Sequence, residues 1–223
     1  MKGNLTIQAL AKFTLGVLLV GAMIFIPAGT LCYWQGWLLM AILFVPMLAA
    51  GFVMLAKNPM LLQKRLNAKE KQGEQKRVVA LSGLLFVGVF VVAGLNHRYQ
   101  WCVVPDWCVW TAAAVFLVSY VMYAEVLREN TYLSRTIEVQ EGQRVIDTGL
   151  YGVVRHPMYT ATTLLFLAMP LVLGSLYAFL LMILYIPLIV KRIKNEEAVL
   201  EDGLAGYRQY KQKVKYRLIP FVW

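Results

Sequence analysis

Two short segments in the second half of the chain concentrate residues that could bind a charged ligand. Residues 155–159 read Arg-His-Pro-Met-Tyr, and residues 192–197 read Arg-Ile-Lys-Asn-Glu-Glu. Proline is tolerated at the first helical position and disfavours helical geometry in the residue before it, so His156 is predicted to lie at a helix entry. The backbone N–H groups at such an entry attract a carboxylate or a phosphate.

The second segment offers a cation and an acid on one helical face. Arg192 and Glu196 are four residues apart, so a continuous helix places them side by side. Each feature also has an ordinary explanation: a surface ion pair or membrane anchor for this pair, a helix cap for His156, and interfacial packing for Tyr151 and Tyr159. Their concentration in two segments that bracket one apolar hairpin favours a site.

Transmembrane helices are the elements that must position these segments. The chain has 223 residues, of which 60% are hydrophobic and 15% charged, with a mean hydropathy of +0.61. This balance excludes a soluble globular, disordered or fibrous protein. Neither a disulfide scaffold nor a structural metal site is expected, because the three cysteines lack C-x-x-C spacing. These cysteines are Cys32, Cys102 and Cys108.

The predicted fold is an all-α integral membrane protein of about six helical segments. A span needs about 20 mostly apolar residues. Four stretches meet this length: 7–27, 35–56, 78–96 and 107–127. A fifth stretch is broken at Gly174-Ser175 and predicts a short hairpin of helices over 158–173 and 176–192, whose turn need not reach the far interface. Lys12 interrupts the first stretch, which argues against a cleavable signal peptide.

The distribution of charge predicts the orientation in the membrane. Segment 57–77 carries seven basic residues against two acidic ones, and segment 191–223 carries eight against four. The loops near 28–34 and 97–106 contain Arg98 as their only basic residue. The positive-inside rule therefore places both termini in the cytoplasm, together with segment 128–158. Five tryptophans are then expected at the outer interface: Trp34, Trp37, Trp101, Trp107 and Trp110. The basic excess is a topology signal, and no nucleic-acid partner is expected.

The motifs of the second half resemble a known family. Residues 149–159 read Gly-Leu-Tyr-Gly-Val-Val-Arg-His-Pro-Met-Tyr, and Arg192-x-x-x-Glu196-Glu197 follows about 35 residues later. Gly206-Tyr207-x-x-Tyr210 and Arg-Leu-Ile-Pro at 217–220 come next. This pattern, over residues 126–223, resembles the isoprenylcysteine carboxyl methyltransferase family and its phospholipid methyltransferase relatives. Ala161 departs from it, since the family often has glycine two residues after the motif tyrosine.

The resemblance implies S-adenosylmethionine as cofactor, held by a cytoplasmic loop and tail without a Rossmann core. The sequence agrees with the second point, since it contains no G-x-G-x-x-G motif of the kind that binds the cofactor in a Rossmann fold. The resemblance also implies that the chain divides into a transmembrane scaffold over 1–127 and a catalytic region over 128–223. The family's substrate-carboxylate position falls on Arg192. The implied cofactor-binding residues are Gln140, Gln143, Arg144, Val145, Ile146, Tyr151, His156, Pro157, Met158, Tyr159 and Glu196.

The expected activity is methyl transfer from S-adenosylmethionine to a lipidic or prenylated acceptor that enters from the bilayer. A carboxylate acceptor, as in an isoprenylcysteine, is favoured, and Arg192 would hold it. A phospholipid amine would instead need a base, for which His156 or Glu196 are candidates. Two other classes stay open: a non-catalytic multi-pass protein, and a membrane reductase that uses a nicotinamide cofactor. A prokaryotic inner membrane is expected, although the cysteines and basic loops fit an endoplasmic reticulum equally. The sequence does not indicate an oligomeric state.

Overall fold

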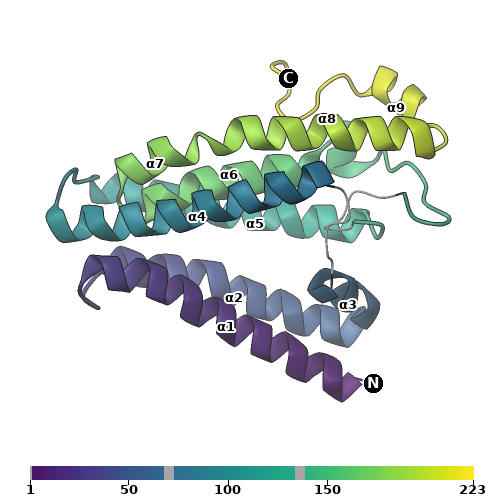
Figure 1. Ribbon diagram of the computed structural model, residues 1–223. Helices are drawn as coiled ribbons and strands as arrows, with labels where there is room; N and C mark the ends of the chain where they lie inside the picture. The colour runs from purple at the N-terminus through teal and green to yellow at the C-terminus, as the bar shows by residue number, and fades with distance from the viewer. Residues whose placement is uncertain (1, 68–72, 134–138) are drawn as a thin grey trace.

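The fold is a bundle of long helices (Figure 1). The computed structural model describes residues 2–67, 73–133 and 139–223. All regular secondary structure within these ranges is helical, which confirms the predicted all-α fold. The α-helices are α1 (Lys2–Ala28), α2 (Trp34–Lys57), α3 (Pro59–Asn67), α4 (Gly73–Tyr99), α5 (Asp106–Glu129), α6 (Pro157–Val172), α7 (Leu176–Met182), α8 (Tyr185–Gly203) and α9 (Tyr207–Lys213), and Gly149–Gly152 form a 3-10 helix, η1.

Five helical stretches in the described residues are long and apolar enough to cross a membrane: Leu5–Ala28, Trp34–Lys57, Gln75–Tyr99, Asp106–Glu129 and Leu176–Gly203. The first four confirm the four predicted spans. The fifth corrects the predicted hairpin, because its second arm spans 28 residues and continues beyond residue 192. The first arm, α6, is short as predicted, with 16 residues. Helix α3, in the basic segment after α2, was not predicted.

A proline explains the interruption between α7 and α8. Pro187 has no N–H, so the carbonyl of Ile183 cannot make the usual bond to the residue four positions later. That carbonyl instead accepts from the N–H of Ile186 at 3.0 Å, and the N–H of Leu184 bonds to Leu181 at 3.1 Å. These shorter-range bonds break the helix at residues 183–184 without reversing its direction.

Small residues let the helices approach closely. Helices α5 and α6 share the largest interface, and α1 packs along α4. A Cβ on Gly94 of α4 would lie 2.6 Å from the carbonyl oxygen of Ile24 and 2.9 Å from Cβ of Pro27. Glycine at this position is therefore required by the contact of α1 with α4.

The connections α1–α2, α4–α5 and α6–α7 meet at one end of the bundle, which we call the turn end. The Tyr33 hydroxyl donates to the carbonyl of Leu173, and Nδ2 of Asn96 donates to the carbonyls of Cys102 at 2.9 Å and Gly174 at 3.4 Å. The hairpin turn thus reaches the same level as the other connections, contrary to the expectation that it could fall short. The five tryptophans predicted to lie together at one membrane interface all have exposed side chains.

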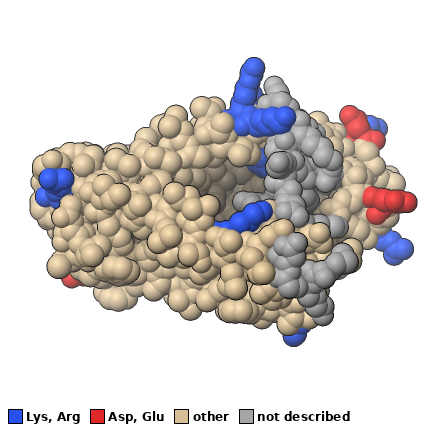
Figure 2. Space-filling view, turned by 60° about the horizontal axis from the view of Figure 1, so that its bottom comes forward, with Lys and Arg blue, Asp and Glu red and all other residues tan. Residues whose placement is uncertain are grey.

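The opposite end, where α5 ends and α6 begins, will be called the site end. Figure 2 shows a surface that is uncharged over most of its length, with charged side chains concentrated toward one end and a hollow flanked by basic side chains. Segment 139–156, the end of α8 and α9 all gather at the site end (Figure 1). The charged segments of the sequence therefore converge where the long apolar helices end.

The close approach at Gly94 gives a matched pair of variants. We expect Gly94→Ala to destabilise the protein by about 1–3 kcal/mol, because the added methyl group would overlap backbone atoms of α1. Gly83→Ala, on the same helix, should leave stability unchanged or slightly raised, since a Cβ there meets no atom within 4 Å. Thermal unfolding in detergent measures both, and equal melting temperatures for the two variants would disprove the close contact.

Candidate functional site

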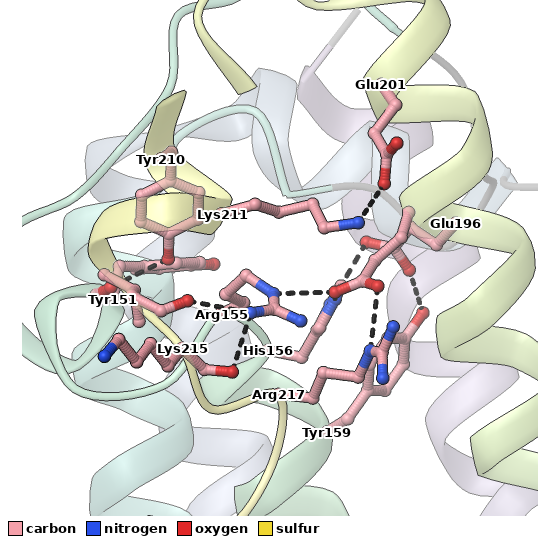
Figure 3. A network of polar contacts seen from close by, with 12 residues as sticks. Tyr151, Arg155, His156, Tyr159, Glu196, Glu201, Tyr210, Lys211, Lys215 and Arg217 are labelled. Carbon is pink, nitrogen blue, oxygen red and sulfur yellow. Dashed lines mark hydrogen bonds and ion pairs between the residues drawn. The ribbon is translucent and has the colours of Figure 1, made fainter. Parts of the chain in front are cut away.

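A buried carboxylate organises the site end. The Glu197 side chain is 3% exposed and accepts from Nε of Arg155 at 2.7 Å and from Nε of Arg217 at 2.8 Å. Nε2 of His156 lies 3.4 Å from the same carboxylate. Figure 3 shows Arg155 and His156, from the entry of α6, close to Arg217, from the C-terminal tail. A buried charge is tolerated only when it is paired and hydrogen-bonded, and Glu197 meets both conditions.

The C-terminal tail is bonded directly across the entry of α6. Nη1 of Arg155 donates to the carbonyls of Val214 at 2.8 Å and Lys215 at 2.9 Å. The backbone N–H groups of Arg155 and His156 donate to the tail carbonyls of Tyr216 and Arg217, each at 2.9 Å. His156 is the N-cap of α6, as predicted. Its own N–H bonds to the tail, so any backbone N–H that contacts a ligand at this entry must come from the first turn of α6.

A cavity lies beside this network, between the segment after α5, the start of α6, α8 and α9. Ten of the twelve predicted site residues line it: Gln143, Arg144, Val145, Ile146, Tyr151, His156, Met158, Tyr159, Arg192 and Glu196. Its lining also includes Asn130, Tyr132, Leu133, Arg155, Leu200, Leu204, Tyr207 and Tyr210, which were not predicted. Of these, Tyr207 and Tyr210 belong to a quoted tail motif, whereas no sequence pattern indicated Asn130.

Two predicted residues, Gln140 and Pro157, do not line the cavity. Pro157 is the first residue of α6, where it sets the start of the helix. Gln140 bonds within its own loop: its N–H donates to Oε1 of Gln143 at 2.8 Å, and its Nε2 donates to the carbonyl of Tyr132 at 2.5 Å. Gln140 therefore shapes the loop that carries Gln143. Residues 134–138 of this loop lie outside the described residues.

A chain of hydrogen bonds connects the predicted acid and the predicted cation. The Tyr159 hydroxyl donates to Oε2 of Glu196 and accepts from Nε of Arg192 at 3.0 Å. Nη1 of Arg192 donates to Oε1 of Gln75 at 3.0 Å. Gln75 is 1% exposed and belongs to α4, so the scaffold half of the chain contributes directly to the site. Gln75 was not predicted as a site residue, because its partner Arg192 lies 117 residues away in the sequence.

Buried tyrosines give the cavity neutral hydroxyl groups. Burial raises the pKa of Tyr151 to about 12 and also raises the pKa of Tyr207, so both stay protonated at neutral pH. Tyr151 accepts from Nδ2 of Asn130 at 2.9 Å, and its carbonyl accepts from the Tyr210 hydroxyl at 2.7 Å. The Tyr207 hydroxyl is buried at the cavity and has no hydrogen-bond partner in the described part of the chain. Such a group is costly to bury and is suited to a polar ligand.

Two comparisons bear on this region. The model of the phospholipid methyltransferase family matches residues 107–205, from the start of α5 to just beyond α8. The Delta(14)-sterol reductase TM7SF2 of Mus musculus is 30% identical over 91 residues, which are 40% of this chain and 22% of that protein. The aligned part thus spans only about a fifth of the reductase. The family match supports a membrane enzyme of methyltransferase type and does not confirm the isoprenylcysteine branch.

The pairing of Glu197 predicts a large effect of neutralising it. Glu197→Gln leaves two guanidinium groups without their counter-charge, so we expect a loss of about 3–5 kcal/mol and release of the tail. Melting temperature and trypsin cleavage at Lys215 or Arg217 report the two effects. Glu125→Gln is the control, because Glu125 pairs with Arg128 on the exposed surface, where such pairs contribute little. Unchanged melting and cleavage in Glu197→Gln would contradict this role.

Proposed function

We propose that this protein is an integral membrane methyltransferase that uses S-adenosylmethionine to methylate a lipidic acceptor. The observation that carries the proposal is the cavity at the site end, where Glu196, buried tyrosines and Arg192 meet. Most of its lining falls within the stretch matched by the phospholipid methyltransferase family, residues 107–205. The long apolar helices would hold the protein in the bilayer, where a lipidic acceptor is also found.

The chemistry of the lining fits S-adenosylmethionine. That cofactor, when bound, supplies a methyl group made electrophilic by a sulfonium. The carboxylate of Glu196 suits a positive group or a ribose diol, and the faces of Tyr151 and Tyr159 suit a cation or an adenine. The unpaired Tyr207 hydroxyl can donate to a ligand oxygen. Gln143 to Ile146 line another part of the cavity, where backbone and side-chain groups can contact the ligand.

Arg192 is the residue we assign to the acceptor. Its guanidinium is oriented by the Tyr159 hydroxyl and by Gln75, and it is one helical turn before Glu196. A guanidinium binds a carboxylate through two parallel hydrogen bonds, so it can align an anionic acceptor that already carries its own nucleophilic oxygen. We therefore propose carboxyl methyl ester formation on an isoprenylcysteine-like acceptor. A phospholipid amine is the alternative within the same reaction class.

For an amine acceptor the base would have to come from the cavity. His156 is 5% exposed, with Nε2 3.4 Å from Glu197 and Nδ1 3.9 Å from Glu196. Because Glu197 engages the imidazole on one side, Glu196 is the more accessible base of the two. The oriented guanidinium favours a carboxylate acceptor, for which no base is needed.

A reductase is the second candidate, and the similarity to a mouse sterol reductase supports it. The two functions differ in the ligand of the cavity. A dinucleotide carries a negatively charged pyrophosphate, whereas S-adenosylmethionine carries a sulfonium and an ammonium. Glu196 can pair with the ammonium or the sulfonium of the methyl donor, whereas Arg144 and Arg192 in the same lining could contact a pyrophosphate. The family match over residues 107–205 is therefore what favours the methyl donor.

Binding and turnover measured on purified protein in detergent test these assignments together. Labelled S-adenosylmethionine should bind, NADPH should not, and Glu196→Gln should weaken binding by about 1–3 kcal/mol. Arg192→Lys keeps the charge but loses the planar fork, so it should leave cofactor affinity unchanged and lower methyl transfer at least about tenfold, equal to ~1.4 kcal/mol. If NADPH binds and S-adenosylmethionine does not, the proposed methyltransferase function is wrong and the reductase function is favoured. Full activity of Arg192→Lys would make that residue an anchor only.

The orientation follows from the same proposal, since the site end carries the basic segments. We place the site end and both termini in the cytoplasm, in a prokaryotic inner membrane. Single cysteines at Lys57 and Arg208, in a chain with the three native cysteines replaced, should react with an impermeant reagent only from the cytoplasmic side. A cysteine at Arg98 should react only from the other side. Labelling of positions 57 and 208 from opposite sides would exclude this topology.

A further inference from the structure

A second cavity lies between α1, α2, α3 and α5 and shares no residue with the first. Its volume is about 480 Å³. Most of the lining is apolar and comes from the site-end halves of three long helices, with Phe13, Leu48, Phe52 and Leu127 among the residues. Figure 1 shows α1 and α2 diverging from α4 and α5 toward the end where the N-terminus lies. An apolar space of this size beside spanning helices can hold a hydrocarbon chain.

Two cations, Lys12 and Arg65, lie in this mostly apolar lining. Lys12 lies inside the apolar run of α1, and its ammonium donates to the carbonyl of Leu66 at 2.6 Å. Nη1 of Arg65, on α3, donates to the hydroxyl of Tyr123 at 2.6 Å, and its guanidinium carbon lies 5.4 Å from the centre of that ring. The described lining contains no aspartate or glutamate. The cavity therefore combines an apolar body with a positive rim.

Lys12 lies near the start of the apolar stretch Leu5–Ala28, from where its ammonium can reach the level of lipid headgroups. The bond from Lys12 to Leu66 uses one of three ammonium hydrogens, so the group can donate further. The positive charge of Arg65 is held beside the same cavity by Tyr123. Together the two side chains match a single anionic group at the level where the apolar helices end.

We propose that this cavity binds a phospholipid with an anionic headgroup. Its acyl chain lies between α1, α2 and α5, and its phosphate contacts Lys12 and Arg65. The lipid is a bound structural partner and not the methyl acceptor, because none of the residues that line the first cavity takes part. The proposal holds whichever acceptor the first cavity uses.

Thermal unfolding of the full-length protein in detergent, with and without added lipid, provides the test. Phosphatidylglycerol should raise the melting temperature by at least about 4 °C, and phosphatidylcholine and inorganic phosphate should not. Lys12→Gln and Arg65→Gln should lose this increase, and Lys12→Arg should keep it. Lys57→Gln is the matched control, because it removes one exposed positive charge at the end of α2 outside the cavity.

A filling variant tests the apolar part without touching either cation. Gly51 lines the cavity, and a Cβ there meets no atom within 4 Å. Gly51→Leu should fold normally and lose most of the increase caused by phosphatidylglycerol. The proposal is overturned if Gly51→Leu and both charge variants keep the full increase, or if phosphatidylcholine or inorganic phosphate stabilises the protein equally. Binding of phosphate alone would indicate an ion site without a lipid.

Discussion

The site end depends on one buried negative charge. Glu197 is the point where α8, the start of α6 and the C-terminal tail meet, and each of the last two contributes cationic side chains to it. The cost of burying a carboxylate falls only when its partners are all in place. The position of α8 is therefore coupled to that of the tail, and a change in one of them alters the walls of the first cavity.

Adjacent acids on α8 serve different purposes because successive residues of a helix point in different directions. Glu197 is buried and pairs with Arg155 and Arg217. Glu196 lines the cavity and bonds to Tyr159. One helical turn earlier, Arg192 reaches the same tyrosine from the other side. A single hydroxyl on α6 thus orients a carboxylate and a guanidinium that belong to the same helix.

The spans and the hairpin could be predicted because hydropathy over about 20 residues is a local property. The length of α8 could not, since its last turns are mostly polar: residues such as Lys194, Glu196 and Glu201 favour a helix without being apolar. The candidate cavity was largely predicted from residues close to two motifs. Gln75 was missed, because nothing in the surrounding apolar sequence encodes a contact with a residue 117 positions away.

The break at residues 183–184 divides the second arm of the hairpin into α7 and α8, both of which contact α4. Arg192 lies eight residues beyond this break, or about 12 Å along the helix axis. Beyond the break, Glu197 binds Arg155 and Arg217, and Arg192 binds Gln75 of α4, so the positions of Arg192 and Glu196 are set by contacts at the site end and not by the path of α7.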